Sequence, residues 1–231
     1  MNKARRTILA IAFTCVAIAP LALAQPAGHP RTQAVKSPMD GVMSALFGAK
    51  TFEQAAIAPD GKQLAWVETT KAGSAIFVST VTGGTPRRIT AGGMTESAVA
   101  WSPDSKQIAF FSDAAKSGQP QIYVTSAAGG ASRKLTSVKG FLSTPGWSPD
   151  GKTIAFLFTE NAERAAGPLV AEKAQTGVIK EAVTEQRLTL VNVASGKTSQ
   201  ISPADMYVYE YDWSPDSKSF VTTARARQRR Q

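Results

Sequence analysis

The sequence predicts an all-β fold, an incomplete β-propeller of about three and a half four-stranded blades. A motif of the type Trp-Ser-Pro-Asp-Gly-Lys-x-Ile-Ala-Phe occurs four times along the chain. Its aspartates are separated by 44, 46 and 66 residues and are Asp60, Asp104, Asp150 and Asp216. Spacings near 45 residues are typical of one four-stranded propeller blade per repeat. Helical periodicity is nearly absent from residues 51–224, which indicates the same class.

The first 24 residues have the pattern of a secretory signal peptide. A basic start is followed by a short apolar stretch, residues 7–19, and small residues stand at the two positions that a signal peptidase reads before Gln25. We expect cleavage after Ala24, a periplasmic or secreted location, and no membrane contact after cleavage. An uncleaved membrane anchor is the alternative, although a bilayer span takes about 17–25 apolar residues. The only cysteine, Cys15, lies in this leader, so the mature chain would contain no disulfide.

Residues 25–50 are interpreted as a linker that contains a candidate short helix at 40–47, and the partial propeller is predicted for residues 51–224. In each motif, proline presets the first turn position and aspartate can accept a hydrogen bond from the backbone two residues on. Gly61 and Gly151 tolerate the positive φ that follows, whereas Ser105 and Ser217 replace glycine in the other two repeats. We therefore interpret the four aspartates as structural turn residues; calcium binding is the alternative.

Each repeat carries a second hairpin after the motif. Gly83-Gly84, Gly129-Gly130 and Ser195-Gly196 separate strand-like runs, which is a hairpin signal. The predicted blade is therefore strand, motif turn, strand, loop, strand, glycine turn, strand. The third repeat is longer because of an insertion at about residues 161–183. This insertion is either a surface elaboration or a lid that shapes a binding site.

The charge of the chain does not indicate a nucleic-acid partner. The formal net charge is +9, but seven of the 26 basic residues lie in the leader and in the last seven residues. The remaining 19 basic residues stand against 17 acidic ones, so the body is near neutral.

No catalytic set, metal site or cofactor motif is recognisable. A Ser-His-Asp hydrolase needs an imidazole between nucleophile and carboxylate, and the single histidine, His29, lies in the predicted linker. The sequence has no Gly-x-Ser-x-Gly elbow, P-loop or Gly-x-Gly-x-x-Gly fingerprint, and no histidine or cysteine cluster. We expect no catalysis on this chain, no cofactor and no metal.

The run Tyr207-Val-Tyr-Glu-Tyr-Asp-Trp213 carries the candidate binding residues. Strand alternation predicts the three tyrosines and Trp213 on one face and Val208, Glu210 and Asp212 on the other. The strand precedes a motif turn, so we expect it to be an innermost strand. The aromatic face could simply pack between blades. Alternatively, Glu210 or Asp212 faces the channel and holds a positively charged ligand end, such as a peptide amino terminus.

The motifs resemble the propeller repeats of TolB-type proteins and of exported serine peptidases of the prolyl oligopeptidase and dipeptidyl peptidase family. Three runs are more similar to the peptidases, namely Leu46–Gly61, Thr176–Leu188 and Ser202–Trp213. The resemblance implies a propeller that gates peptide substrates to a C-terminal α/β-hydrolase domain. It also implies an ammonium-binding role for Glu210, although the second, adjacent glutamate of that site is lacking.

Two functions follow from the resemblance. The first is the propeller fragment of an exported serine peptidase whose catalytic domain is absent from this chain, with peptide substrates as partners of the full-length parent. The second is a free-standing periplasmic TolB-like scaffold that binds a protein partner. The basic tail, residues 225–231, resembles no earlier blade. Codons for residues 226–231, read one nucleotide later, can encode His-Gly-Ser-Gly-Asp-Asn, so we regard a shifted reading frame as a hypothesis for this tail.

Overall fold

The computed structural model describes residues 51–70, 73–91, 94–162 and 185–226, which form antiparallel β-sheets and turns without helix. All of them belong to one compact unit, Met43–Gln231. In this part of the chain there is no helix long and apolar enough to cross a membrane. The predicted signal peptide, the linker with its candidate helix, and nearly all of the insertion at 161–183 lie outside the described residues.

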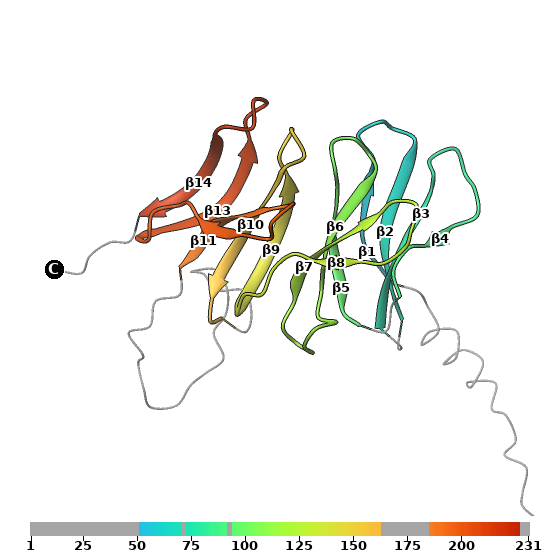
Figure 1. The fold of residues 1–231 in the computed structure, drawn as a ribbon, viewed down its shortest axis with the longest axis horizontal. Coiled ribbons are helices and arrows are strands. Elements are labelled where there is room, and N and C mark those ends of the chain that lie inside the picture. The colour runs from blue at the N-terminus through green and yellow to red at the C-terminus, as the bar shows by residue number, and fades with distance from the viewer. Residues whose placement is uncertain (1–50, 71–72, 92–93, 163–184, 227–231) are drawn as a thin grey trace, which may run out of the picture. The chain divides into compact units, whose positions relative to one another are not determined.

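Three four-stranded sheets and one hairpin follow one another along the chain (Figure 1). The first sheet consists of β1 (Thr51–Ile57), β2 (Gln63–Thr70), β3 (Gly73–Thr80) and β4 (Arg87–Arg88). The second consists of β5 (Glu96–Trp101), β6 (Gln107–Ser112), β7 (Gln121–Ser126) and β8 (Arg133–Lys134). The third consists of β9 (Gly140–Trp147), β10 (Thr153–Glu160), β11 (Gln186–Asn192) and β12 (Thr198–Gln200). The hairpin consists of β13 (Met206–Trp213) and β14 (Phe220–Ala226).

This arrangement confirms the predicted class and the count of about three and a half blades. In every complete sheet the strands pair in sequence order and antiparallel, as the alternation of motif turns and glycine turns predicts. Strand β14 extends two residues past the predicted boundary at 224, because Arg225 and Ala226 pair with Tyr207 and Met206. The first two residues of the predicted tail therefore belong to the sheet.

The core lies between successive sheets. Alternating residues of each strand face the next sheet, which buries one apolar cluster at each of the three interfaces. Phe110 and Phe156 lie at equivalent places in the first and second interface and are 1% and 0% exposed. Each sheet is therefore stabilised mainly by its neighbour, as in other repeat architectures.

The first strand of each sheet contains a β-bulge. The pairing register shifts between Phe52 and Gln54 in β1, and corresponding shifts occur in β5, β9 and β13. The bulges include Glu53, Ala98, Thr144 and Tyr209. Ala98 and Thr144 have φ values of 59° and 51°, which non-glycine residues rarely adopt. A bulge adds one residue to one strand, so it shifts the inward and outward alternation along these strands.

Candidate functional site

The four motif aspartates are turn residues, as predicted. In each motif the residue after aspartate donates its backbone N–H to the carbonyl three positions earlier, which closes a β-turn. The carboxylate of Asp104 accepts hydrogen bonds from the Ser102 hydroxyl (2.6 Å) and from the backbone N–H of Lys106 (3.1 Å). Asp150 and Asp216 make the same pair of bonds. Asp60 keeps only the backbone bond, from Lys62 N–H (2.9 Å), because Ala58 stands where the other motifs have serine.

These bonds lower the pKa of Asp104, Asp150 and Asp216 below the ordinary value of 3.8. The largest cause is the serine hydroxyl two residues earlier, followed by the backbone N–H two residues later, and both favour the charged carboxylate. A lowered pKa means that the folded protein binds the proton less tightly than the unfolded chain does. The resulting stabilisation is present above the unfolded pKa and is lost as the pH falls through the folded pKa.

We expect Asp104→Asn to lower the melting temperature at neutral pH and to have less effect in acid. The carboxylate stabilises the turn only while it is charged, so the difference between wild type and variant should shrink as the pH falls through the lowered pKa of Asp104. Thermal melts from pH 7 to pH 2.5 would measure it. Asp205→Asn, at an exposed position outside the motif turns, is the control. A difference that stays constant over this range would show that the charge is irrelevant to the turn.

The motif also joins neighbouring sheets. Each motif tryptophan donates its indole Nε1–H to a backbone carbonyl of the preceding sheet: Trp101 to Ala56 (2.9 Å), Trp147 to Ala100 (3.1 Å) and Trp213 to Gly146 (3.2 Å). The serines that replace glycine have a second role that the sequence did not reveal. The hydroxyls of Ser105 and Ser217 accept the backbone N–H of Asp60 (3.1 Å) and Asp150 (3.0 Å) in the preceding sheet. Their φ values of 59° and 61° show that serine adopts the conformation expected of glycine.

The tyrosine-rich strand β13 packs on the third sheet through Val208, Tyr211 and Trp213. The Tyr211 hydroxyl donates toward the carbonyls of Thr144 (2.6 Å) and Ala155 (2.8 Å), and burial raises the pKa of Tyr211 well above its ordinary value of 10. The bulge at Tyr209 makes the predicted alternation wrong. Val208 packs with Tyr211 and Trp213 and does not share a face with Glu210 and Asp212, whereas Tyr207 and Tyr209 lie outside that cluster. The packing of Tyr211 and Trp213 between sheets is confirmed.

Glu210 and Asp212 are exposed on the face of β13 that is turned away from the third sheet. Glu210 stands where the first sheet has Gln54, whose amide bonds the backbone N–H (2.9 Å) and the C=O (3.3 Å) of Val99 in the next sheet. Asp212 stands where the first three sheets have Ala56, Ala100 and Gly146. One Asp212 oxygen accepts the N–H of Trp213 (2.8 Å). The face that meets the next sheet in the earlier repeats therefore carries two carboxylates here.

Two tyrosine rings precede these carboxylates along β13. The ring centroids of Tyr207 and Tyr209 lie 4.8 Å apart, and burial is the main cause that raises the pKa of Tyr207, with the neighbouring Tyr209 and Glu185 contributing. Aromatic faces attract cations. Carboxylates and tyrosines together can therefore attract an ammonium or guanidinium group at this surface.

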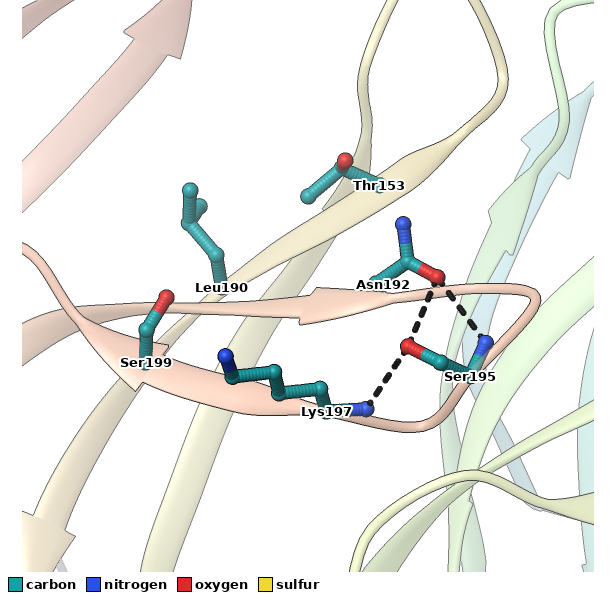
Figure 2. Close-up of a pocket in the computed structure, with 6 residues that line it drawn as sticks. All are labelled: Thr153, Leu190, Asn192, Ser195, Lys197 and Ser199. Carbon is teal, nitrogen blue, oxygen red and sulfur yellow. Dashed lines mark hydrogen bonds between the residues drawn. The ribbon is translucent and has the colours of Figure 1, made fainter.

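The third sheet contains a shallow hollow of about 440 Å³ (Figure 2). Leu190 and the surrounding polar residues Thr153, Asn192, Ser195, Lys197 and Ser199 line it. The Asn192 side-chain carbonyl accepts from the N–H and the hydroxyl of Ser195 (both 2.9 Å), and Ser195 Oγ accepts from Lys197 N–H (3.3 Å). The sequence indicates only a glycine turn in this segment, because the lining residues come together only when β10, β11 and β12 pair.

The described strands and turns show no catalytic fold, and they contain no group of three or more His, Cys, Asp or Glu residues that could hold a metal ion. The predicted absence of catalysis for the whole chain stays a prediction.

Comparison with known proteins agrees with the propeller fold. The TolB β-propeller domain family (PD40) matches residues 43–190. A TolB from Agrobacterium tumefaciens is similar in structure, with a TM-score of 0.57 and 22% identity over 76% of this chain and 55% of that one. An acylaminoacyl peptidase in complex with a chloromethyl ketone has a TM-score of 0.52 and 14% identity over 78% of this chain and 28% of that one. The tricorn protease has a TM-score of 0.52 and 12% identity over 70% of this chain and 14% of that one.

At these identities the likenesses establish the fold alone. The chain spans about half the length of the TolB structure, at 55%, and a smaller share of the two peptidases. Curated protein sequences give no match. Because the family match covers more than half of the chain and includes the first two sheets and most of the third, the protein belongs to the TolB β-propeller (PD40) family.

Proposed function

We propose that this chain is a noncatalytic propeller portion of an exported serine peptidase, which admits peptide substrates to an α/β-hydrolase domain. The observation that carries the proposal is the exposed pair Glu210 and Asp212 on β13, which follows two paired tyrosine rings along the same strand. The structural similarity to an acylaminoacyl peptidase supports the proposal at the level of the fold.

The chemistry of this surface suits the amino terminus of a peptide. A protonated α-amino group donates up to three hydrogen bonds, and charge-assisted bonds to carboxylates are stronger than neutral ones. Glu210 is exposed, and one oxygen of Asp212 remains beyond the bond to Trp213. The rings of Tyr207 and Tyr209 can add a cation–π contact at the edge of the same surface.

The test compares two versions of one peptide, with a free and with an acetylated amino terminus, bound to the full chain. We expect Glu210→Gln and Asp212→Asn together to weaken binding of the free-terminus peptide by about ten-fold, because charge-assisted bonds are lost. Binding of the acetylated peptide should change little. Asp205→Asn serves as the matched control for the charge change. Equal affinities of wild type for both peptides would contradict the proposed role of the two carboxylates.

A second candidate is a periplasmic TolB-like scaffold that binds a protein partner without an associated peptidase. The family match and the TM-score of 0.57 to a TolB favour it. Reading the gene in all three frames beyond codon 231 would separate the two candidates. Further Ser-Pro-Asp repeats followed by a Gly-x-Ser-x-Gly elbow and a histidine would support the peptidase. Further repeats that end without such an elbow would support the scaffold.

A further inference from the structure

Two of the four motif turns contain an Asp-Gly pair, and the folded chain restrains the two pairs differently. Asp60-Gly61 and Asp150-Gly151 occur in the same local sequence, Pro-Asp-Gly-Lys, whereas the other two motif aspartates are followed by serine. An Asp-Gly pair is chemically distinctive because glycine has no Cβ atom to hinder an approach to its backbone nitrogen. In an unfolded chain the two pairs should therefore react alike, so any difference between them reflects the fold.

The reaction of such a pair joins the aspartate side chain to the backbone. The backbone nitrogen of Gly61 bonds to Cγ of Asp60, and the N–H proton and the hydroxyl of the carboxyl group leave together as water. A second water molecule then opens the resulting succinimide ring. When this breaks the bond between the Gly61 nitrogen and the backbone carbonyl carbon of Asp60, the chain continues through Cβ and Cγ as isoaspartate. One water leaves and one is added, so the mass is unchanged and no oxidant or reductant takes part.

The carboxyl group of Asp150 is held more firmly than that of Asp60. The Asp150 carboxylate accepts hydrogen bonds from the Ser148 hydroxyl (2.6 Å) and from the backbone N–H two residues later (3.1 Å). The Asp60 carboxylate accepts only the corresponding N–H (2.9 Å) among the described residues, because Ala58 stands in the place of the serine. The serine bond is also the largest cause that lowers the pKa of Asp150. A charged carboxylate releases its oxygen less readily than a protonated carboxyl group, so this bond opposes the reaction twice.

The other hydrogen bonds of the two turns are the same. In each turn the glycine N–H donates to the carbonyl three positions earlier (2.8 Å in both), and the glycine φ is +70°. The aspartate N–H donates to a serine hydroxyl of the following sheet or hairpin, Ser105 (3.1 Å) or Ser217 (3.0 Å). The Lys152 ammonium lies 3.8 Å from the Asp150 carboxylate, but an exposed ion pair contributes little. The hydroxyl of Ser148 is therefore the bond that distinguishes the two turns.

Water reaches the motif turns even where sheets flank them on both sides. The side chains of Asp104 and Asp150, in the second and third sheets, are 52% and 41% exposed, and Asp60 is exposed as well. The reaction needs only a local opening, in which the glycine N–H leaves its carbonyl and the carboxyl group rotates toward the nitrogen. Openings of this size cost much less than unfolding of the whole domain. At Asp60 one bond fewer has to break.

We propose that Asp60-Gly61 is a site of spontaneous succinimide and isoaspartate formation in the folded protein, and that the serine missing from this turn selects it over Asp150-Gly151. A hydrogen bond to a charged group corresponds to a difference of about ten-fold or more in rate. Isoaspartate adds a methylene group to the backbone and moves the carboxylate away from the N–H of Lys62. The modification therefore loosens the first motif turn and its junction with Ser105 of the second sheet.

The test is to incubate the full chain at neutral pH and physiological temperature, and to quantify isoaspartate in its peptides by liquid chromatography and fragmentation mass spectrometry. We expect isoaspartate to accumulate about ten-fold faster at Asp60 than at Asp150. Asp104 and Asp216 should form little, because the serine that follows each of them hinders the attack. In concentrated urea Asp60 and Asp150 should react at equal rates. Equal rates in the folded chain, a faster reaction at Asp150, or no isoaspartate at Asp60 would each overturn the proposal.

Two variants exchange the restraint between the turns. Ala58→Ser supplies the missing hydroxyl at a position where alanine and serine are equally buried, since Ala58, Ser102 and Ser148 are 2%, 3% and 1% exposed. It should slow the reaction at Asp60 to the rate of Asp150. Ser148→Ala should raise the rate at Asp150 to that of Asp60. In each variant the unaltered turn is the internal control, and rates that do not follow the serine would contradict the assignment. The wild-type comparison is made within one molecule, so it decides the proposal even if a variant does not fold.

Discussion

Replacing Phe156 by alanine is expected to destabilise the protein by about 3–5 kcal/mol, the usual cost of removing a buried aromatic side chain. Phe156 is 0% exposed, lies in the interface between the second and third sheets, and contacts Phe158 edge-to-face with ring centroids 6.2 Å apart. Small folded domains have a free energy of unfolding of only about 5–15 kcal/mol. The Phe156→Ala variant should therefore lose a large part of the free energy of unfolding.

Urea unfolding followed by tryptophan fluorescence would measure this effect. Phe52→Ala is the matched control, because the Phe52 side chain is 64% exposed and its removal should leave the unfolding midpoint nearly unchanged. Equal midpoints for the two variants would mean that the interface between the second and third sheets does not carry the stability we assign to it.

A comparable loss is expected for Gly140→Ala at the start of β9. A Cβ atom at this position would lie 2.2 Å from the carbonyl oxygen of Thr159 and 2.9 Å from the backbone nitrogen of Asn161. The φ of +147° is also unfavourable for residues other than glycine. Because backbone atoms make the clash, β9 and β10 would have to separate locally. A strained backbone alone usually costs about 1–3 kcal/mol, and the clash adds to that cost. We therefore expect a destabilisation of about 3 kcal/mol or more, or a protein that does not accumulate.

Gly118→Ala separates the clash from the strain. Gly118 also has a positive φ, of +75°, but a Cβ there would meet nothing within 4 Å. We expect about 1 kcal/mol for this control, which reflects the backbone conformation alone. Thermal melts of both variants at equal concentration give the comparison. A Gly140→Ala protein as stable as Gly118→Ala would contradict the close approach of β9 and β10.

The repeat motif made the fold predictable, because proline, aspartate and glycine fix the turns locally and the apolar runs between them define the strands. The structure contains each expected turn at Asp60, Asp104, Asp150 and Asp216. What could not be predicted depends on contacts between repeats. Ser105 looked like a weaker turn residue, yet its hydroxyl accepts the N–H of Asp60 one sheet earlier.

The candidate site was predictable only in part, for a local reason. Strict alternation placed Val208 beside Glu210, and the bulge at Tyr209 separates them. A bulge leaves no clear pattern in one sequence, because its extra residue can have any side chain. Alternation predicted Glu210 and Asp212 on one face of the strand, and both side chains are exposed, whereas their ligand stays a prediction. The hollow at Lys197 has no sequence signal, because its lining residues come from separate strands that meet only in the folded sheet.

The bulges of the four first strands have a consequence for how such a protein can diversify. Each bulge adds a residue that does not belong to the regular alternation. The four added residues carry a carboxylate, a methyl group, a hydroxyl and a phenol; they are Glu53, Ala98, Thr144 and Tyr209. None of the four is buried, although each lies within a few residues of the tightly packed interfaces. Glu53 and Thr144 are exposed, so changes of their side chains should cost little stability, whereas Ala98 packs against the second apolar cluster. The first strand of each repeat can therefore evolve a new surface chemistry at its exposed bulge positions while the framework that carries it stays unchanged.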